Sequence, residues 1–169
     1  MNSRTRLVIF GYGNPSRGDD ALGPALMERA GALLQAHPAI GEVELVADFQ
    51  LQVEHSLDLV GKDLALFVDA SVACPAPFAF EVIHPRQDPT YSTHALSPEA
   101  VLHVYQSVRK SDPPLSFLLS VRGDRFELGE PLTPEASRHL EAAWDLLARL
   151  LQDLDPDAWR GRTTAATRP

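Results

Sequence analysis

The stretch Arg6-Leu-Val-Ile-Phe-Gly11 and the change of pattern that follows it decide the fold. A continuous apolar run that ends in glycine is typical of a strand buried on both faces of a sheet. Between Asp20 and Gln35 the apolar residues recur at helical spacing instead, which predicts an amphipathic helix. A buried strand joined to a helix by a short glycine-containing turn is the start of a strand–helix–strand unit.

The same alternation continues along the chain. The patterns predict strands at 42–47, 64–69, 78–83 (nearer an edge) and 115–121, and helices around 53–60, at 98–109 and from 133 to 151. We therefore expect an α/β protein with one three-layer α/β/α domain over residues 1–154 and a twisted, mainly parallel sheet. Residues 155–169 show no apolar periodicity and are expected to form a flexible tail.

Composition excludes several classes of protein. The chain has 169 residues, with 15 Lys and Arg against 23 Asp and Glu, which gives a formal net charge of −8. Such an acidic chain is a poor general binder of nucleic acid, which requires basic surface. The run from Leu7 to Phe10 is too short for a signal-peptide core, and no apolar run is long enough to span a membrane. We expect a cytoplasmic protein and, at this size, a monomer.

The residues that suit covalent catalysis are few. Cys74 is the single cysteine, so neither an internal disulfide nor a cysteine-rich zinc site is available. No Gly-x-Ser-x-Gly nucleophile motif is present, and Cys74 has no histidine near it in the sequence. The sequence therefore offers no standard covalent protease machinery.

Three side chains are expected at the carboxyl edge of the sheet, where ligand sites of such folds gather. Asp20 lies in the glycine-rich turn after the first strand, Asp69 ends the strand 64–69, and His94 lies in the loop before the helix 98–109. Two carboxylates and an imidazole suit zinc or nickel and leave coordination positions open. His55, in the short second helix, is kept in reserve.

The glycine-rich turn is a poor match to a dinucleotide-binding loop. Ser16 occupies the position where the motif needs its third glycine, and two acids at a helix start would repel a pyrophosphate. Asp19 or Asp20 could serve only as a helix cap, which would leave the other acid free to face the strand ends.

Taken together, these motifs resemble a known family. Gly11-x-Gly13-Asn14-(x)4-Asp19-Asp20-x-x-Gly23, Phe67-Val-Asp69-Ala70, Ser92-x-His94 and the stretch 123–134 resemble the nickel–iron hydrogenase maturation endopeptidases, over roughly residues 6–151. The resemblance implies a three-layer fold and an enzyme that removes a C-terminal extension from the hydrogenase large-subunit precursor after nickel insertion. Nickel would be carried by the substrate, and no tightly bound cofactor of the protein's own is expected.

The resemblance also assigns roles to residues. The metal-contacting groups carry over as Asp20, Asp69 and His94, with Asp19 as either the general base or a helix cap. This chain departs from many relatives by having Asp rather than Glu at position 20, and by 48–54 in place of an Asp-Gly-Gly-Thr-like stretch. A metallohydrolase with its own metal, a non-cleaving chaperone for nickel-loaded precursor, and a nucleotide-binding module remain alternatives.

Overall fold

A five-stranded sheet forms the centre of the protein. The computed structural model describes residues 4–88 and 95–164. Its strands are β1 (Arg6–Tyr12), β2 (Glu42–Asp48), β3 (Leu64–Ser71), β4 (Phe78–Ile83) and β5 (Leu115–Arg122), in the order β2-β1-β3-β5-β4. Only β4 is antiparallel to its neighbour. The expected mainly parallel sheet is confirmed, and the strand 78–83 lies at its edge.

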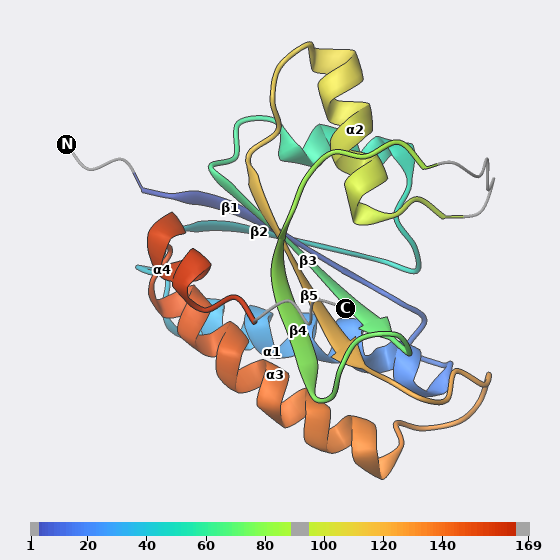
Figure 1. Cartoon of the computed structure of the whole chain (residues 1–169). Coiled ribbons are helices and arrows are strands. Elements are labelled where there is room, and N and C mark those ends of the chain that lie inside the picture. Colours follow the sequence, from blue (N-terminus) through green and yellow to red (C-terminus); the bar gives the residue numbers. More distant parts are fainter. Residues whose placement is uncertain (1–3, 89–94, 165–169) are drawn as a thin grey trace.

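Helices cover both faces of the sheet (Figure 1). On one face lie α1 (Leu22–Ala36), α3 (Pro134–Gln152) and the short α4 (Pro156–Gly161). On the other lie the 3-10 helix η2 (Val53–Leu59) and α2 (Pro98–Arg109). Alternate residues of the buried strands serve two separate cores, because successive side chains of a strand point to opposite faces. The predicted three-layer α/β/α architecture is therefore confirmed.

Two helices begin where local sequence chemistry predicts. The Ser97 hydroxyl accepts a hydrogen bond from the Ala100 amide (3.1 Å), and the Thr133 hydroxyl accepts one from the Ala136 amide (3.1 Å). Each cap is followed by a proline, whose missing N–H costs nothing in the first turn. These caps fix where α2 and α3 leave the loops at the carboxyl edge.

The second helix differs from its expected form. Apolar spacing predicts an α-helix around Val53 and Leu57, but the segment is a 3-10 helix on which both of these side chains are exposed. A 3-10 helix has three residues per turn, so its buried face falls on other positions, here His55, Ser56 and Leu59.

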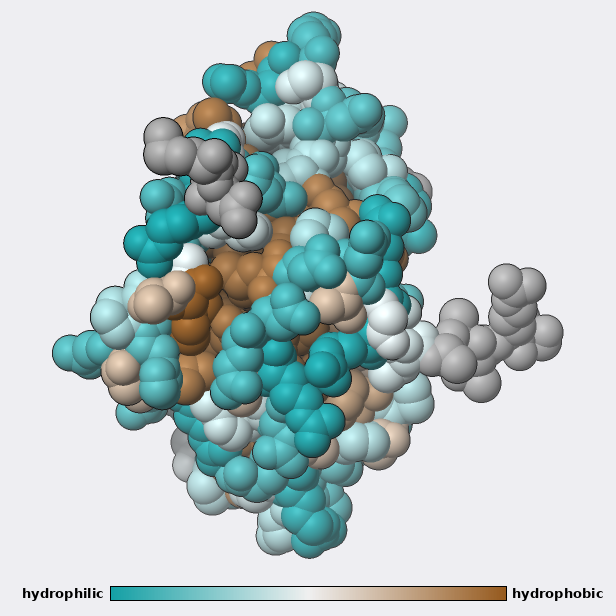
Figure 2. Space-filling model, turned by 90° about the vertical axis from the view of Figure 1, so that its left-hand side faces the viewer, coloured by the Kyte–Doolittle hydropathy of each residue, from teal (hydrophilic) through white to brown (hydrophobic). Residues whose placement is uncertain are grey.

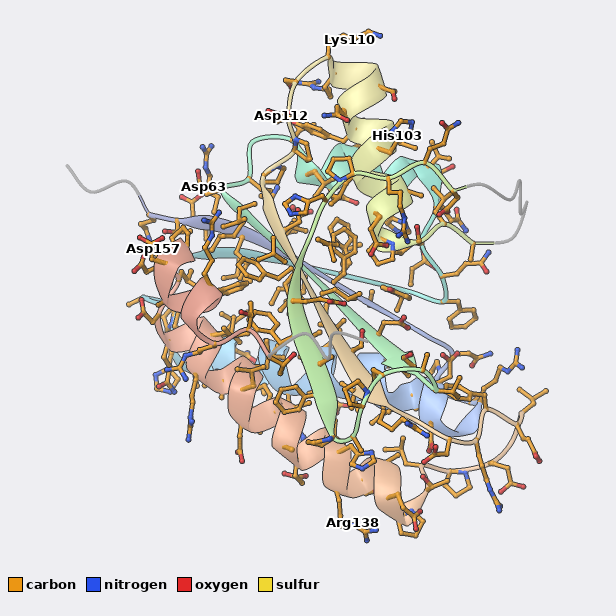
Figure 3. All side chains as sticks on the ribbon, in the orientation of Figure 1. Asp63, His103, Lys110, Asp112, Arg138 and Asp157 are labelled. Carbon is orange, nitrogen blue, oxygen red and sulfur yellow. The ribbon has the colours of Figure 1, made fainter. Side chains whose placement is uncertain are left out.

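The prediction of a flexible tail from residue 155 is wrong for the part of the tail that the structure describes, which ends at residue 164. Residues 156–161 form α4, and Trp159 is fully buried against Phe80 and Phe117. The Trp159 indole N–H donates to the carbonyls of Leu150 (3.1 Å) and Asp153 (2.8 Å). Figure 3 shows Asp157 of the same helix on the side of the molecule where β1 begins. A single aromatic residue produces no periodicity, so the sequence does not reveal this docking. Residues 165–169 lie outside the described residues.

The side of the molecule at the amino ends of the strands carries an apolar area framed by polar residues (Figure 2). This side is opposite to the carboxyl edge, so the apolar area lies away from the predicted site. Within residues 4–88 and 95–164, no helix is long and apolar enough to cross a membrane.

Candidate active site

The carboxyl ends of β1, β2, β3 and β5 meet at one edge of the sheet. Tyr12, the last residue of β1, pairs with Asp48, the last residue of β2, and Ser71 of β3 pairs with Arg122 of β5. The turn after β1 leads into the 3-10 helix η1 (Gly18–Ala21), which carries Asp19 and Asp20. Parallel strands thus bring the predicted acids Asp20 and Asp69 to the same edge.

The turn after β1 holds Asp20 in a fixed position. Gly13 has φ of +143°, and a Cβ atom built there would lie 2.2 Å from the Asp20 carbonyl oxygen. The next residue, Asn14, donates its amide N–H to the Asp20 carboxylate at 2.6 Å. Gly13 itself donates to the Asp48 carbonyl at 3.1 Å. Glycine is therefore needed at position 13 for both its conformation and its lack of a side chain.

Asp69 is a partly buried carboxylate with a perturbed pKa. Burial, followed by the nearby negative charge of Asp20, raises the pKa of Asp69 from 3.8 to about 7, although the Ala70 amide N–H opposes the shift. Desolvation disfavours a charged carboxylate, and a second negative charge adds to this penalty. Such a pair of acids at a strand edge is typical of a site that receives a cation or exchanges a proton.

Two further residues act on Asp69 that the sequence patterns did not single out. The Tyr12 hydroxyl is buried and makes no hydrogen bond of ordinary geometry with any described residue. Burial, and then the nearby Asp69 carboxylate, raise the pKa of Tyr12 well above its usual value. Glu99, in the first turn of α2, adds a smaller negative contribution to both groups. The position of Tyr12 between Gly11 and Gly13, at the end of a buried strand, is the signal that could have identified it.

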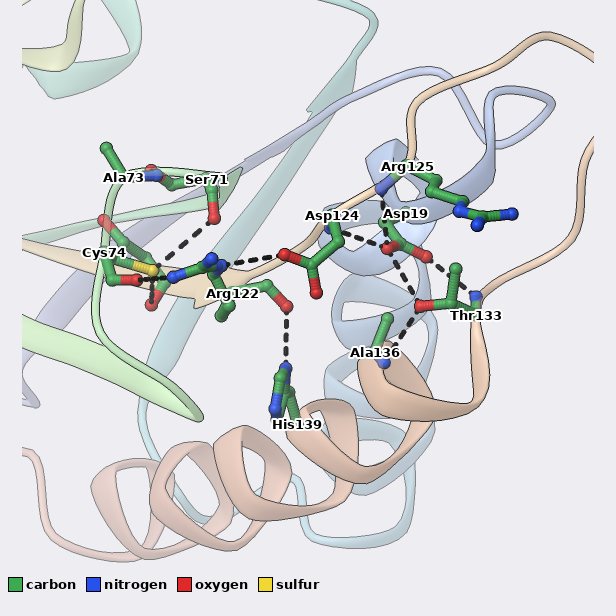
Figure 4. A network of polar contacts seen from close by, with 11 residues as sticks. Asp19, Ser71, Ala73, Cys74, Arg122, Asp124, Arg125, Thr133, Ala136 and His139 are labelled. Atoms are coloured by element: carbon green, nitrogen blue, oxygen red, sulfur yellow. Dashed lines mark hydrogen bonds and ion pairs between the residues drawn. The ribbon is translucent and has the colours of Figure 1, made fainter.

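Asp19 has a different environment from Asp20 (Figure 4). It is fully buried and accepts hydrogen bonds from the backbone amides of Asp124 (2.8 Å), Arg125 (3.2 Å) and Thr133 (2.8 Å), and from the Thr133 hydroxyl (3.0 Å). Burial alone would raise the pKa of Asp19, but these hydrogen bonds outweigh it and lower the pKa. It does not cap its own helix, because η1 has no side-chain cap. Asp19 instead fastens the loop between β5 and α3 to the turn after β1, and all of its hydrogen bonds favour this structural role over that of a general base.

The same loop is held to the end of β5 by Arg122. Its guanidinium contacts the Asp124 carboxylate (3.1 Å) and donates to the Cys74 carbonyl (3.0 Å), while its own carbonyl accepts from Nδ1 of His139 (2.9 Å). Burial raises the pKa of the Cys74 thiol, which opposes formation of a nucleophilic thiolate. Arg122, His139 and Cys74 therefore belong to the framework of the edge.

Both ring nitrogens of His55, the histidine kept in reserve, make polar contacts within the protein. Its Nδ1 accepts the Gln52 amide N–H at 2.8 Å, and its Nε2 lies 3.3 Å from the Asp48 carboxylate. Since Nδ1 is an acceptor, the ring proton is on Nε2 and points to Asp48. His55 therefore orients the end of β2 and has no free nitrogen for catalysis in this arrangement.

The predicted site residue His94 lies outside the described residues. The chain beyond it is held close to the edge: the Leu96 amide donates to the carbonyl of Leu51, three residues after β2 ends (3.2 Å). The Ser97 hydroxyl donates to the Asp88 carboxylate at 2.8 Å. In the described part of the chain, no three His, Cys, Asp or Glu side chains are grouped to hold a metal ion, so Asp20 and Asp69 form a pair whose predicted third member is His94.

Comparison with known proteins shows what this arrangement is similar to. No protein-family model and no curated protein matches the chain. The crystal structure of the NiFe hydrogenase maturation protease HycI from Thermococcus kodakarensis KOD1 does match, with 25% identity and a TM-score of 0.66, over 89% of this chain and 94% of that one. The hydrogenase maturating endopeptidase HybD from E. coli matches with 24% identity and a TM-score of 0.61, over 86% and 92% of the two chains. The hydrogenase 2 maturation peptidase from Thaumarchaeota archaeon SCGC_AB-539-E09 matches with 19% identity and a TM-score of 0.61, over 88% and 100%.

The chain thus has the fold of the nickel–iron hydrogenase maturation proteases, and the resemblance seen in its sequence is confirmed. Among these structures, its likeness to HycI of T. kodakarensis combines a quarter of identical residues with nearly complete coverage of both chains. The similarity to these proteases supports the expectation that the chain is a peptide hydrolase.

Proposed function

We propose that this protein is an endopeptidase that removes the C-terminal extension of a nickel–iron hydrogenase large-subunit precursor after nickel has been inserted. Asp20, Asp69 and His94 contact the nickel that the substrate carries. The observation that supports this most directly is the pair of carboxylates at the carboxyl edge, where the charge of Asp20 helps to raise the pKa of Asp69. A cation delivered by the substrate relieves the repulsion between the two acids, whereas a metal-free precursor does not.

Asp20 and Asp69 have different roles at this edge of the sheet. Asp20 is presented by the rigid turn at Gly13 and Asn14, so its carboxylate is already in place before substrate arrives. With a pKa of about 7, Asp69 can accept or release a proton near neutral pH, which suits general acid–base catalysis. The substrate-borne metal supplies electrostatic activation of the peptide bond or of a water molecule.

The test is the mass of the large-subunit precursor after incubation with this protein, with and without nickel loaded. Wild-type protein is expected to release a C-terminal fragment only from the nickel-loaded form. Asp20→Asn, Asp69→Asn and His94→Ala are each expected to abolish release. Asp157→Asn, which changes an exposed acid on α4 at the opposite end of the molecule, is the matched control and is expected to cleave normally.

The other results lead to other functions. Full cleavage by all three site variants would contradict the assignment of the site. Stable binding with an unchanged precursor mass would indicate a chaperone. Cleavage that does not depend on nickel in the precursor, but is lost on chelation, would indicate a metallohydrolase with its own metal.

A further inference from the structure

Large apolar side chains are exposed in the loops around the acid pair. Six such side chains are exposed among the described residues, and three of them lie in three different loops at the carboxyl edge. Phe49 (66% exposed) follows the end of β2, Val72 (57%) follows the end of β3, and Leu128 (74%) lies in the loop between β5 and α3. We call these three residues the apolar rim.

Backbone contacts place the rim beside the turn that carries the acids. The Gly129 amide donates to the Ser16 carbonyl at 2.7 Å, so Leu128 lies next to the turn that precedes Asp19 and Asp20. Val72 follows Asp69 by three residues on the same strand end, and Phe49 follows Asp48, whose carbonyl holds the Gly13 amide (3.1 Å). Three loops that carry exposed apolar side chains therefore leave the sheet at the same end as the two acids.

The rim loops are also acidic. Asp48 precedes Phe49, and exposed Glu127 and Glu130 stand on either side of Leu128. Arg125 in the same loop carries the opposite charge, but Glu127, Glu130 and Asp48 together with Asp20 and Asp69 leave more acids than bases in these segments. A hollow of about 230 Å³, lined in part by Glu127, Glu130 and Leu132, lies in the same loop. Interfaces typically combine buried apolar anchors with a charged margin of opposite sign on the partner.

We propose that the apolar rim is the docking surface for the folded body of the substrate precursor, at the apolar, basic surface surrounding its C-terminal extension. This inference rests on the proposed function, because the chain whose bond reaches Asp20 and Asp69 must lie over these loops. Phe49, Val72 and Leu128 determine how tightly the precursor binds, and the two acids act on the bond to be cut. A peptide of the extension alone lacks the surface that the rim contacts.

Removal of rim side chains tests the proposal. Phe49→Ala and Leu128→Ala are each expected to raise KM for nickel-loaded precursor, and the Kd for its complex, by about 10-fold. Val72→Ala removes less surface and is expected to raise them by about 3-fold. Val108→Ala is the matched control, since Val108 is equally exposed (67%) but lies beside Lys110, at the end of α2 remote from the acids (Figure 3). Thermal melting checks that all four variants are folded.

For the rim variants the expected loss falls on KM and Kd with kcat near the wild-type value, whereas Asp69→Asn is expected to abolish cleavage. Rim variants with the wild-type KM and Kd, or an equal loss in Val108→Ala, would overturn the proposal. Failure of the proposed function is a separate result, in which wild-type protein releases no fragment. In that case the Kd for nickel-loaded precursor tests the docking surface separately. Weaker precursor binding by the rim variants would support the proposal, and no binding by wild-type protein would overturn it.

Discussion

Replacement of Asp69 by Asn is expected to change how stability depends on pH. The pKa of Asp69 is about 7 in the folded protein, against 3.8 for an ordinary aspartate. Between about pH 4 and 7 the folded state therefore holds a proton that the unfolded state has released, and stability falls as pH rises through this window. A shift of about 3 pKa units corresponds to about 4 kcal/mol at 1.36 kcal/mol per unit. Asn mimics the protonated acid and carries no such penalty.

The measurement is urea unfolding of metal-free wild-type and Asp69→Asn protein from pH 4 to pH 8.5. The two free energies of unfolding are expected to be similar at pH 4. They are expected to diverge with rising pH until the variant is about 4 kcal/mol more stable above pH 7, with a melting temperature roughly 10 °C higher. The exposed Asp157 supplies the control, since Asp157→Asn is expected to follow the wild-type curve throughout.

Parallel curves for wild-type and Asp69→Asn protein across this range would refute the reasoning. They would show that Asp69 is ionised in the folded protein at an ordinary pH, and hence that neither burial nor the charge of Asp20 acts on it as the geometry indicates.

Three further predictions concern the framework of the site (Asp19 and Gly13) and the packing of α4 (Trp159). Asp19→Ala leaves buried amides without an acceptor and is expected to cost about 4 kcal/mol in urea unfolding at pH 7; because the pKa of Asp19 is lowered, the part of this cost that depends on its charge is present above about pH 4 and declines as pH falls below it. A loss under 1 kcal/mol would contradict the role given to Asp19. Gly13→Ala forces a Cβ against the Asp20 backbone, and is expected to cost about 3 kcal/mol and to abolish precursor cleavage; an active, stable variant would show that the turn tolerates a side chain. Trp159→Ala empties a fully buried position and is expected to lower the free energy of unfolding by about 4 kcal/mol, whereas a flexible tail would give no change.

Most of the fold could be predicted because its signals are local. Buried strands are short apolar runs, and the caps at Ser97 and Thr133 lie within three residues of the amides they bind. The two elements that differ depend on distant contacts or on an unusual helix type. Trp159 is buried only because Phe80 and Phe117 of the sheet offer it a place, and the 3-10 geometry around His55 shifts the buried face away from the apolar spacing.

The candidate site, like the fold, could be predicted where the signal is local and not where it depends on distant contacts. That Asp20 and Asp69 lie at one edge follows from strand order alone, but the division of roles between Asp19 and Asp20 does not. Asp19 is buried by amides that lie more than 100 residues further along the chain, in a loop that no local pattern places against it. Tyr12 and Glu99 were missed for a similar reason, since their effect on Asp69 depends on how β1 and α2 pack beside β3.

The end of the described chain has a consequence for self-association. β4 is an edge strand with the apolar sequence Phe78-Ala-Phe-Glu-Val-Ile83, and such an edge can pair with another copy through its free backbone groups. Thr164 occupies part of that edge, because its hydroxyl accepts the Phe80 amide (3.0 Å) and its own amide donates to the Phe80 carbonyl (2.8 Å). A chain shortened before Thr164 would expose these groups beside aromatic side chains, so it would be prone to dimerise or aggregate through its sheet even while folded.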